Sequence, residues 1–280
     1  MPDSNLIQQI NQTKILSNSL PIWGFGQMGV GLKTPDAMLY IDLCLSDGVR
    51  ELFGEFWVRA YDPPVEPSRI NNADFYLITH EHMDHLDPRT VGPIAQASPQ
   101  AKFVAPGWCV DLLHECGVSD ERIIVPEALK PFALPGTGVV VTAVPSAHYK
   151  KEYDEQKGYR WLGYLIESNG VRFYHAGDTI IYDDYIETLQ RLPLPDVVML
   201  PVNGRDHYRE TEFDVTGNLL PVEAARLARD LGWDTLIPGH NDLYPNNTIP
   251  FGEIVHVLET TAPRQKHKFL QPGELFYYVK

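Results

Sequence analysis

The chain has 280 residues, of which 44% are hydrophobic and 11% aromatic, so folding can remove roughly three quarters of its surface from water. Charged residues make up 21%, and the 23 Pro and 21 Gly are spread along the chain, which excludes a disordered or collagen-like protein. Acidic residues outnumber basic ones by 37 to 23, and the net charge of −14 disfavours a nucleic-acid partner. Without a repeat or linker, residues 1–280 are expected to form a single domain.

The cysteine pattern and the apolar runs indicate where the protein resides. Cys44, Cys109 and Cys116 are odd in number and form no Cys-x-x-Cys pair, which disfavours a disulfide scaffold or a cysteine zinc site. The start of the sequence does not look like a signal peptide, and no run of about 18 apolar residues occurs. We therefore expect a cytoplasmic protein with no membrane partner, while a homo-oligomer is left open.

Strands are predicted throughout the chain. Short apolar runs, many rich in β-branched residues, predict them at 38–43, 75–79, 102–105, 139–144, 164–168, 171–175, 197–202, 235–238 and 275–279. Asn169-Gly170 joins two of these runs. Because both residues accept a positive φ, the pair predicts a two-residue hairpin turn.

Helices are predicted mainly in the second half of the chain. Apolar residues at three- and four-residue spacing predict them over 108–115, 182–192, 221–231 and 251–260. Pro221 suits a first helical turn, and Gly232 stands where a C-terminal cap is expected. This order indicates a layered α/β fold with sheets inside and helices outside.

One histidine-rich segment carries most of the functional information. Thr79-His80-Glu81-His82-Met83-Asp84-His85 directly follows the predicted strand 75–79, and chance would produce its H-x-H-x-D-H pattern in about one of a thousand such sequences. Residues two apart in an extended segment point to the same side, so His80, His82 and Asp84 would face one way. A turn would bring in His85. The segment predicts a metal site, with two histidines for one ion and an Asp-His pair for a second.

Further ligands are expected where other strands end. His148, Asp178 and His240 each follow an apolar run, in the segments Val-Pro-Ser-Ala-His, His-Ala-Gly-Asp and Ile-Pro-Gly-His. Loops at strand ends commonly carry site residues. Gly177 would permit a close backbone approach beside Asp178.

The order of these motifs resembles the metallo-β-lactamase superfamily over nearly the whole chain. The resemblance implies an α/β fold, a four-layer αββα sandwich with two metals at one edge. It further implies one metal held by His80, His82 and His148, and a second held by Asp84, His85 and His240. Asp178 would bridge the two. All seven positions carry the residue type that the family pattern requires.

A narrower resemblance is to the branch that contains L-ascorbate-6-phosphate lactonase. Similar segments are Gly29-Val30-Gly31-Leu32-Lys33, Tyr174-His175-Ala176-Gly177-Asp178 and Pro238-Gly239-His240-Asn241-Asp242. The chain departs from that branch by being shorter between Val144 and Arg160 and by differing after Val202. The resemblance implies a hydrolase of a small ester or lactone, with a sugar-acid phosphate lactone among the candidates.

The ligand types set the expected chemistry. Five imidazoles and two carboxylates without a thiolate suit zinc, manganese or iron, and the resemblance favours manganese, with zinc as the alternative. One or two divalent ions would provide a metal-bound hydroxide near neutral pH and polarise a substrate oxygen. Asp84 is also expected to be catalytic, by orienting the nucleophile and passing its proton to the leaving group.

Substrate-binding groups are expected after the run 197–202. Asn203 could bind a carbonyl, and Arg205 and Arg209 could clamp a phosphate or carboxylate of a small anionic substrate. The alternative for both arginines is ordinary solvated surface charge.

Three other functions remain alternatives to a small-molecule hydrolase. A phosphodiesterase or nuclease of the same fold is disfavoured by the acidic charge. A di-iron redox relative would usually carry Glu in place of His82 and an added flavin domain, and neither is found. A non-catalytic module is opposed by the intact set of metal-binding residue types.

Overall fold

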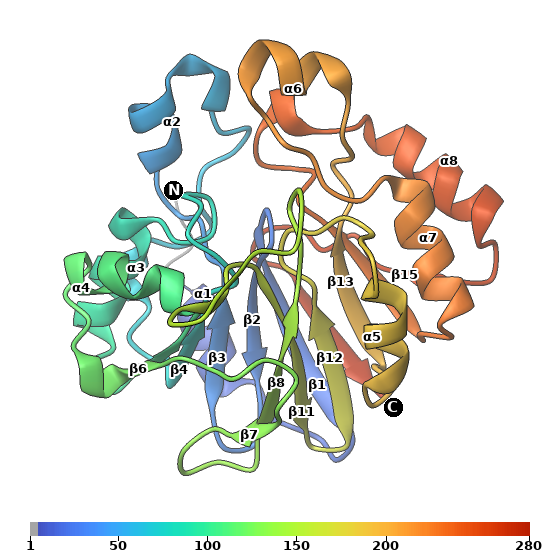
Figure 1. Cartoon of the computed structure of the whole chain (residues 1–280). Coiled ribbons are helices and arrows are strands. Elements are labelled where there is room, and N and C mark those ends of the chain that lie inside the picture. The colour runs from blue at the N-terminus through green and yellow to red at the C-terminus, as the bar shows by residue number, and fades with distance from the viewer. Residues whose placement is uncertain (1–4) are drawn as a thin grey trace.

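A computed structural model describes residues 5–280 and places two seven-stranded sheets face to face (Figure 1). The first sheet has the strand order β16 (Leu275–Val279), β1 (Ser19–Gly26), β2 (Gly29–Lys33), β3 (Met38–Ile41), β4 (Phe75–Leu77), β5 (Lys102–Val104) and β6 (Ile123–Ile124). The second has the order β15 (Lys266–His267), β14 (Thr235–Gly239), β13 (Val197–Pro201), β12 (Val171–His175), β11 (Leu162–Ser168), β8 (Val140–Pro145) and β7 (Phe132–Ala133). A small hairpin joins β9 (Tyr153–Asp154) and β10 (Gly158–Tyr159).

Helices cover the outer faces of both sheets (Figure 1). The first sheet is covered by α1 (Leu6–Gln12), α3 (Pro88–Ala97) and α4 (Val110–Glu115), and the second by α5 (Tyr185–Arg191), α7 (Pro221–Asp230) and α8 (Phe251–Thr261). Two further helices, α2 (Gly48–Phe53) and α6 (His207–Phe213), lie beyond one end of the sandwich. Short 3-10 turns are η1 (Glu55–Trp57), η2 (Pro67–Arg69), η3 (Gly107–Cys109), η4 (Asp120–Arg122) and η5 (Pro245–Asn247).

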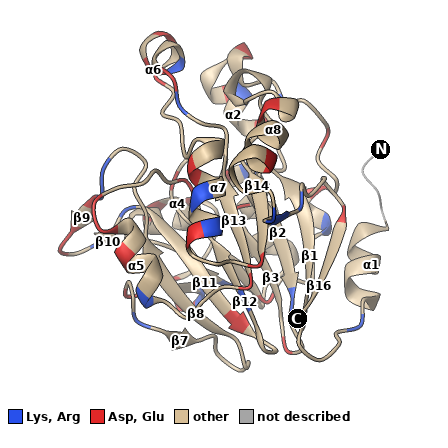
Figure 2. Cartoon of the chain, turned by 90° about the vertical axis from the view of Figure 1, so that its right-hand side faces the viewer, with Lys and Arg blue, Asp and Glu red and all other residues tan. Residues whose placement is uncertain are grey.

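Three layers of apolar side chains hold the four structural layers together. Buried residues such as Ile22 and Phe173 fill the space between the sheets. Ile94 of α3 packs against the outer face of the first sheet, and Leu227 of α7 packs against that of the second. The expectation of an αββα sandwich is therefore confirmed. Figure 2 shows that charged residues lie mainly on helices and loops, as this arrangement requires.

Each sheet contains both parallel and antiparallel strands, and the parallel strands determine where the loops gather. From β3 to β6 the strands of the first sheet run parallel, as do the strands from β12 to β15 in the second. The carboxyl ends of parallel strands meet at one edge, where ligand-binding loops commonly lie. Among residues 5–280 no helix is long and apolar enough to span a membrane.

Most predicted strands and helices are present, with small changes at their ends. The hairpin turn is confirmed, because Asn169 and Gly170 have φ of 51° and 76° between paired strands. The helix expected over 182–192 begins only at Tyr185, because Asp184 has a left-handed φ of 66°. The strand expected over 38–43 ends at Ile41, because Asp42 also turns the chain, with φ 48°.

Candidate metal centre

Four strand ends and the loops that follow them deliver the candidate ligands. The loop after β4 carries His80, His82, Asp84 and His85, and turns sharply because the backbone N–H groups of His85 and Leu86 both donate to the His82 carbonyl, at 2.9 and 2.7 Å. The other ligands follow strands of the second sheet, so the centre lies between the two sheets: His148 after β8, Asp178 after β12 and His240 after β14.

The structure brings these seven side chains into two adjoining groups. His80, His82, His148 and Asp178 form one, and Asp84, His85 and His240 form the other, with the candidate ligand atoms of each group within 4.8 Å of one another. Asp178 also reaches the second group: its Oδ2 lies 3.2 Å from His148 Nε2 and 3.3 Å from His240 Nε2, and its Oδ1 lies 3.3 Å from His85 Nε2.

The side chains fit divalent cations. Ligands about 2.1 Å from a tetrahedral ion are separated by about 3.4 Å, close to the contacts that Asp178 makes. In addition, His80 Nε2, His85 Nε2 and Asp178 Oδ1 are buried without a hydrogen-bond partner among residues 5–280. A buried polar atom without a partner is unfavourable unless an ion or water binds it. The two groups therefore form a His/Asp site for divalent metal.

The protonation of Asp178 and His82 suits a cation. At His85 and His240, by contrast, the carboxylates of Asp178 and Asp84 outweigh burial and raise the pKa, so a metal there would displace a proton. Burial alone would raise the pKa of Asp178, but the imidazoles of His240 and His85 hold it well below its ordinary value. Burial and the neighbouring His148 lower the pKa of His82 to about 4. Asp178 is therefore ionised and His82 neutral at pH 7, which are the forms that bind metal.

Backbone conformation brings Asp178 close to the loop after β4. Gly177 has φ 62°, and a Cβ there would lie 2.7 Å from the Leu162 carbonyl oxygen and 2.8 Å from Thr79 Cβ. Only glycine fits this combination of left-handed backbone and close approach. The role expected for Gly177 is confirmed.

Asp42 supports the centre and was not identified from the sequence. It is fully buried at the end of β3, and its Oδ2 lies 2.8 Å from His85 Nδ1. The same carboxylate accepts hydrogen bonds from the Thr79 N–H at 2.9 Å and hydroxyl at 2.6 Å. A carboxylate that accepts the Nδ1 proton leaves Nε2 of a histidine free for metal. A single Asp after an apolar run was the only signal in the sequence.

Gln27 and Trp161 also adjoin the centre and were likewise missed. Gln27 lies in the turn between β1 and β2, and its side-chain amide donates to Asp84 Oδ2 at 2.8 Å. Trp161 packs beside His80 and His82, with ring centroids 5.0 and 5.1 Å apart. Both are positioned by tertiary packing, and neither belongs to a motif.

Asn203, Arg205 and Arg209 do not reach the candidate ligands. Arg205 makes a two-point ion pair with Glu223, with both contacts at 2.7 Å. Arg209 is buried and donates to Asn247 Oδ1 and to the Asn203 carbonyl, and it pairs with Asp206. None of the three borders the cavity beside the site. The structure therefore gives no support to the expected anion clamp.

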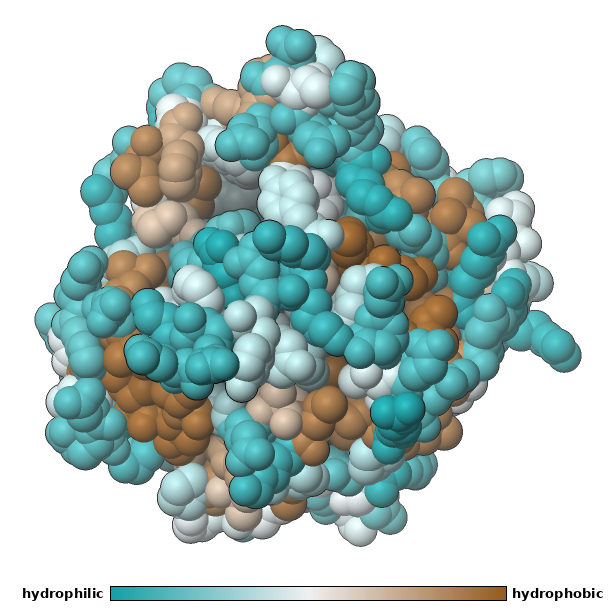
Figure 3. All heavy atoms as spheres, viewed as in Figure 1, coloured by the Kyte–Doolittle hydropathy of each residue, from teal (hydrophilic) through white to brown (hydrophobic). Residues whose placement is uncertain are grey.

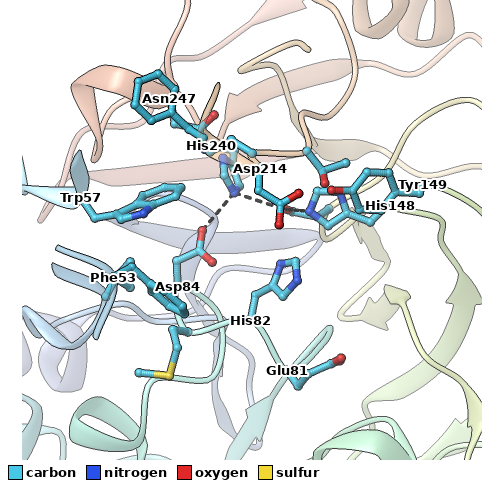
Figure 4. Close-up of a pocket in the computed structure, with 16 residues that line it drawn as sticks. Phe53, Trp57, Glu81, His82, Asp84, His148, Tyr149, Asp214, His240 and Asn247 are labelled. Carbon is cyan, nitrogen blue, oxygen red and sulfur yellow. Dashed lines mark ion pairs between the residues drawn. The ribbon is translucent and has the colours of Figure 1, made fainter. Parts of the chain in front are cut away.

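A cavity of about 580 Å³ opens beside the ligands (Figure 4). Phe53 and Trp57 face the centre from one side, and Tyr149 and Asp214 from the other. His82, Asp84, His148, Asp178 and His240 form its floor. A substrate in this cavity would meet the metal-binding groups directly.

The chain matches known proteins over most of its length. Residues 41–241 match the family model described as "Beta-lactamase superfamily domain". A metal-dependent hydrolase from Methanoculleus marisnigri is 30% identical over 218 residues, which cover 75% of this chain and 82% of that protein. A protein of Salmonella paratyphi B, named a probable L-ascorbate-6-phosphate lactonase, is 24% identical, with 94% of this chain and 81% of that protein covered.

A solved structure agrees with the fold. The isothiocyanate hydrolase from Delia radicum gut bacteria superimposes with a TM-score of 0.71 at 18% identity, covering 91% of this chain and 98% of that one. At this identity the likeness concerns the fold alone. Together with the family match, the paired sheets and the His/Asp site, it leads to one conclusion: the chain belongs to the metallo-β-lactamase superfamily of metal-dependent hydrolases.

Proposed function

We propose that this metal-dependent hydrolase cleaves a small ester or lactone. The observation that carries the proposal is the position of Asp178, whose two carboxylate oxygens contact histidines of both groups at the floor of an open cavity. A carboxylate shared in this way is suited to bridge two cations that act on one substrate. The similarity to a protein named as a lactonase supports the choice of a cyclic or open ester.

The protein side chains would divide the work. Divalent ions, when bound, lower the pKa of water and polarise an acyl oxygen. His80, His82 and His148 would hold one ion, and Asp84, His85 and His240 the other. We further propose manganese as the native metal, because the resemblance to the lactonase branch favours it, with zinc as the alternative, because imidazole-rich sites bind zinc well.

Asp84 would be the catalytic acid and base. It borders the cavity, and its Oδ2 is 3.2 Å from His240 Nε2 and accepts a hydrogen bond from Gln27. From this position the carboxylate can accept the proton of the attacking water and return it to the leaving oxygen.

A cytoplasmic location is part of the proposal, and the three buried, unpaired cysteines support it.

The proposal is tested by purifying the protein with manganese or zinc and assaying neutral esters, lactones and phosphodiesters. We expect ester or lactone turnover that a chelator abolishes and that the metal restores. Asp178→Asn should lose at least one metal and most turnover, because an amide neutralises no charge between two cations. Phosphodiester cleavage alone, or full turnover without metal, would overturn the proposal.

A further inference from the structure

We propose that the cavity beside the metal centre binds an uncharged, apolar part of the substrate, such as an aryl or branched alkyl group, and disfavours anionic groups. This inference rests on the proposed function and specifies its substrate class. It concerns the part of the substrate that does not reach the metal ligands.

Six apolar side chains line the walls of the cavity, alongside polar ones such as Thr216 and Asn247. Five of the six come from two separate segments, 48–57 and 207–216, which stand over the ligands as α2 with η1 and as α6 with the residues after it. Their side chains are joined by one from the loop after β4, and the apolar set is Val49, Phe53, Trp57, Met83, Phe213 and Val215. Figure 3 shows the surface hollowed between α2 and α6, with apolar side chains on the α2 side.

Neighbouring rings hold Phe213 and Trp57 in place, while Phe53 and Phe213 are exposed. The ring of Phe213 stacks on Phe56 at a centroid distance of 4.4 Å, which links α6 to η1. Trp57 packs edge-on against the buried Tyr244 at 5.3 Å. Yet Phe53 and Phe213 remain 58% and 42% exposed. Exposed apolar side chains that gather around a cavity are typical of a ligand-binding wall.

The charges around the cavity disfavour an anion. Within the described residues, no Lys or Arg borders it, whereas Glu81 and Asp214 do. Glu81 forms an ion pair with Arg160, which also pairs with Glu152. Asp214 pairs with no Lys, Arg or His in the part of the chain that the structure describes.

The field of Asp214 reaches the cavity mouth. Figure 4 shows Asp214 next to Tyr149 at the cavity, where a negative group close to its carboxylate would be repelled. A phosphate or carboxylate on the substrate tail would find repulsion here and no guanidinium to bind.

The inference is tested by binding, independently of turnover. Three hydroxamates share one metal-binding group and differ in their tails: acetohydroxamate, phenylacetohydroxamate and succinic monohydroxamate. Their dissociation constants for the metal-loaded protein are measured by calorimetry. We expect the phenyl tail to improve affinity by roughly 10- to 100-fold over acetohydroxamate, because it buries apolar surface. The carboxylate tail should weaken binding.

Point variants test whether these differences in affinity arise from the cavity walls. Phe53→Ala should remove about three- to tenfold of the gain from the phenyl tail and leave acetohydroxamate binding unchanged. Leu52→Ala is the matched control, since Leu52 is 63% exposed on the same helix and does not border the cavity. Asp214→Asn should improve only the binding of the succinic compound. Circular dichroism verifies that each variant is folded.

The outcomes separate this inference from the proposed function. Equal binding of all three tails, or preference for the carboxylate, would overturn the inference even if esters are hydrolysed. Tail-selective binding that depends on Phe53 but not on Leu52 supports it. If the same protein then cleaves no ester or lactone, the proposed function fails while the assignment of the apolar cavity stands.

Discussion

At the scale of single residues, the centre depends on side chains that contact no substrate. His85 is fully buried, and Asp42 fixes its ring through Nδ1 while Thr79 fixes Asp42 in turn. Such a chain of hydrogen bonds holds a ligand in one orientation before metal arrives, which reduces the entropy lost on binding. The seven ligand candidates are therefore only part of what determines metal affinity.

Asp42→Asn is expected to weaken metal binding by about 10- to 100-fold. An amide in place of the carboxylate would have to offer acceptors to both Thr79 donors and to His85, and it has only one oxygen. Affinity is measured by competition with a chromogenic chelator. Asp74→Asn is the control, because Asp74 accepts a hydrogen bond from the Met38 N–H away from the centre. Equal losses in both variants would contradict a specific role for Asp42.

Gly177→Ala tests the close approach beside Asp178. A left-handed φ costs an alanine about 1–2 kcal/mol, and the clash with the Leu162 carbonyl adds to this. Gly136→Ala provides the comparison, since Gly136 has φ 78° and a Cβ added there would meet no atom within 4 Å. Thermal unfolding should show the larger loss of stability for Gly177→Ala, together with reduced metal content. Similar losses would mean that crowding is unimportant.

At the scale of elements, local patterns predict structure where the pattern is uninterrupted. The strands over 171–175 and 275–279 have the predicted ends, and the Asn169-Gly170 turn follows from backbone preference alone. Helix α3 was not predicted, since Gly92 and Pro93 interrupt its apolar spacing. It forms because Asp87 caps its first turn and Ile94 packs into the core, a tertiary gain that outweighs weak propensity.

The residues of the candidate site were likewise predictable only where the local sequence pattern indicates them. The histidines and aspartates after β4 could be singled out because they are close together in the sequence. Gln27 could not, because its neighbour Asp84 is 57 positions away and is reached through a turn with φ 56°. The positions of Arg205 and Arg209 were also unpredictable, because Glu223, which pairs with Arg205, and Asn247, which accepts a hydrogen bond from Arg209, become their neighbours only after folding.

Arg205 is expected to stabilise α7 and not to bind substrate. Arg205→Ala should lower the free energy of unfolding by about 0.5–1 kcal/mol at pH 7, the range for partly exposed ion pairs. Burial alone would raise the pKa of Glu223, but Arg205 lowers it below its ordinary value. The stabilisation is therefore present above the unfolded-state pKa of the carboxyl and disappears as pH falls through its folded-state pKa.

The measurement is urea unfolding of Arg205→Ala and of the unaltered protein over a range of acidic pH. The difference between them should shrink as the pH falls. Activity supplies the control, because kcat/KM for an anionic and a neutral ester should both stay unchanged. A selective rise in KM for the anionic ester would instead support the expectation from the sequence that Arg205 binds an anionic substrate.

At the scale of the whole molecule, the metal centre lies where both sheets contribute loops. Ligands from the loop after β4 belong to the first sheet, and His148, Asp178 and His240 belong to the second. Bound ions would therefore connect the two sheets at one end of the sandwich, while the apolar core between the sheets connects them along their length. Because the apolar core also connects the sheets, the fold should form without metal. Bound metal should, however, increase the stability of the folded protein.

Removing metal should lower the melting temperature without abolishing the fold. At free metal of about 100 times the dissociation constant, binding contributes about 2.7 kcal/mol to the native state. Scanning calorimetry with and without chelator measures the difference, and far-UV circular dichroism of the apoprotein should retain the native secondary structure. The melting temperature should also rise with metal concentration. An identical transition in both states would show that the ions do not bridge the sheets.

Apart from Met83, the apolar side chains of the cavity wall and the ligands are carried by different parts of the chain, and this has an evolutionary consequence. Phe53 and Phe213 stand on short helices beyond the sandwich and are partly exposed, so replacing them disturbs little core packing. The ligands stay fixed by strands that such replacements do not touch. Selection can therefore change which molecules are accepted by a few surface substitutions while the hydrolytic chemistry is inherited intact, so the family could diversify its substrates without passing through inactive ancestors.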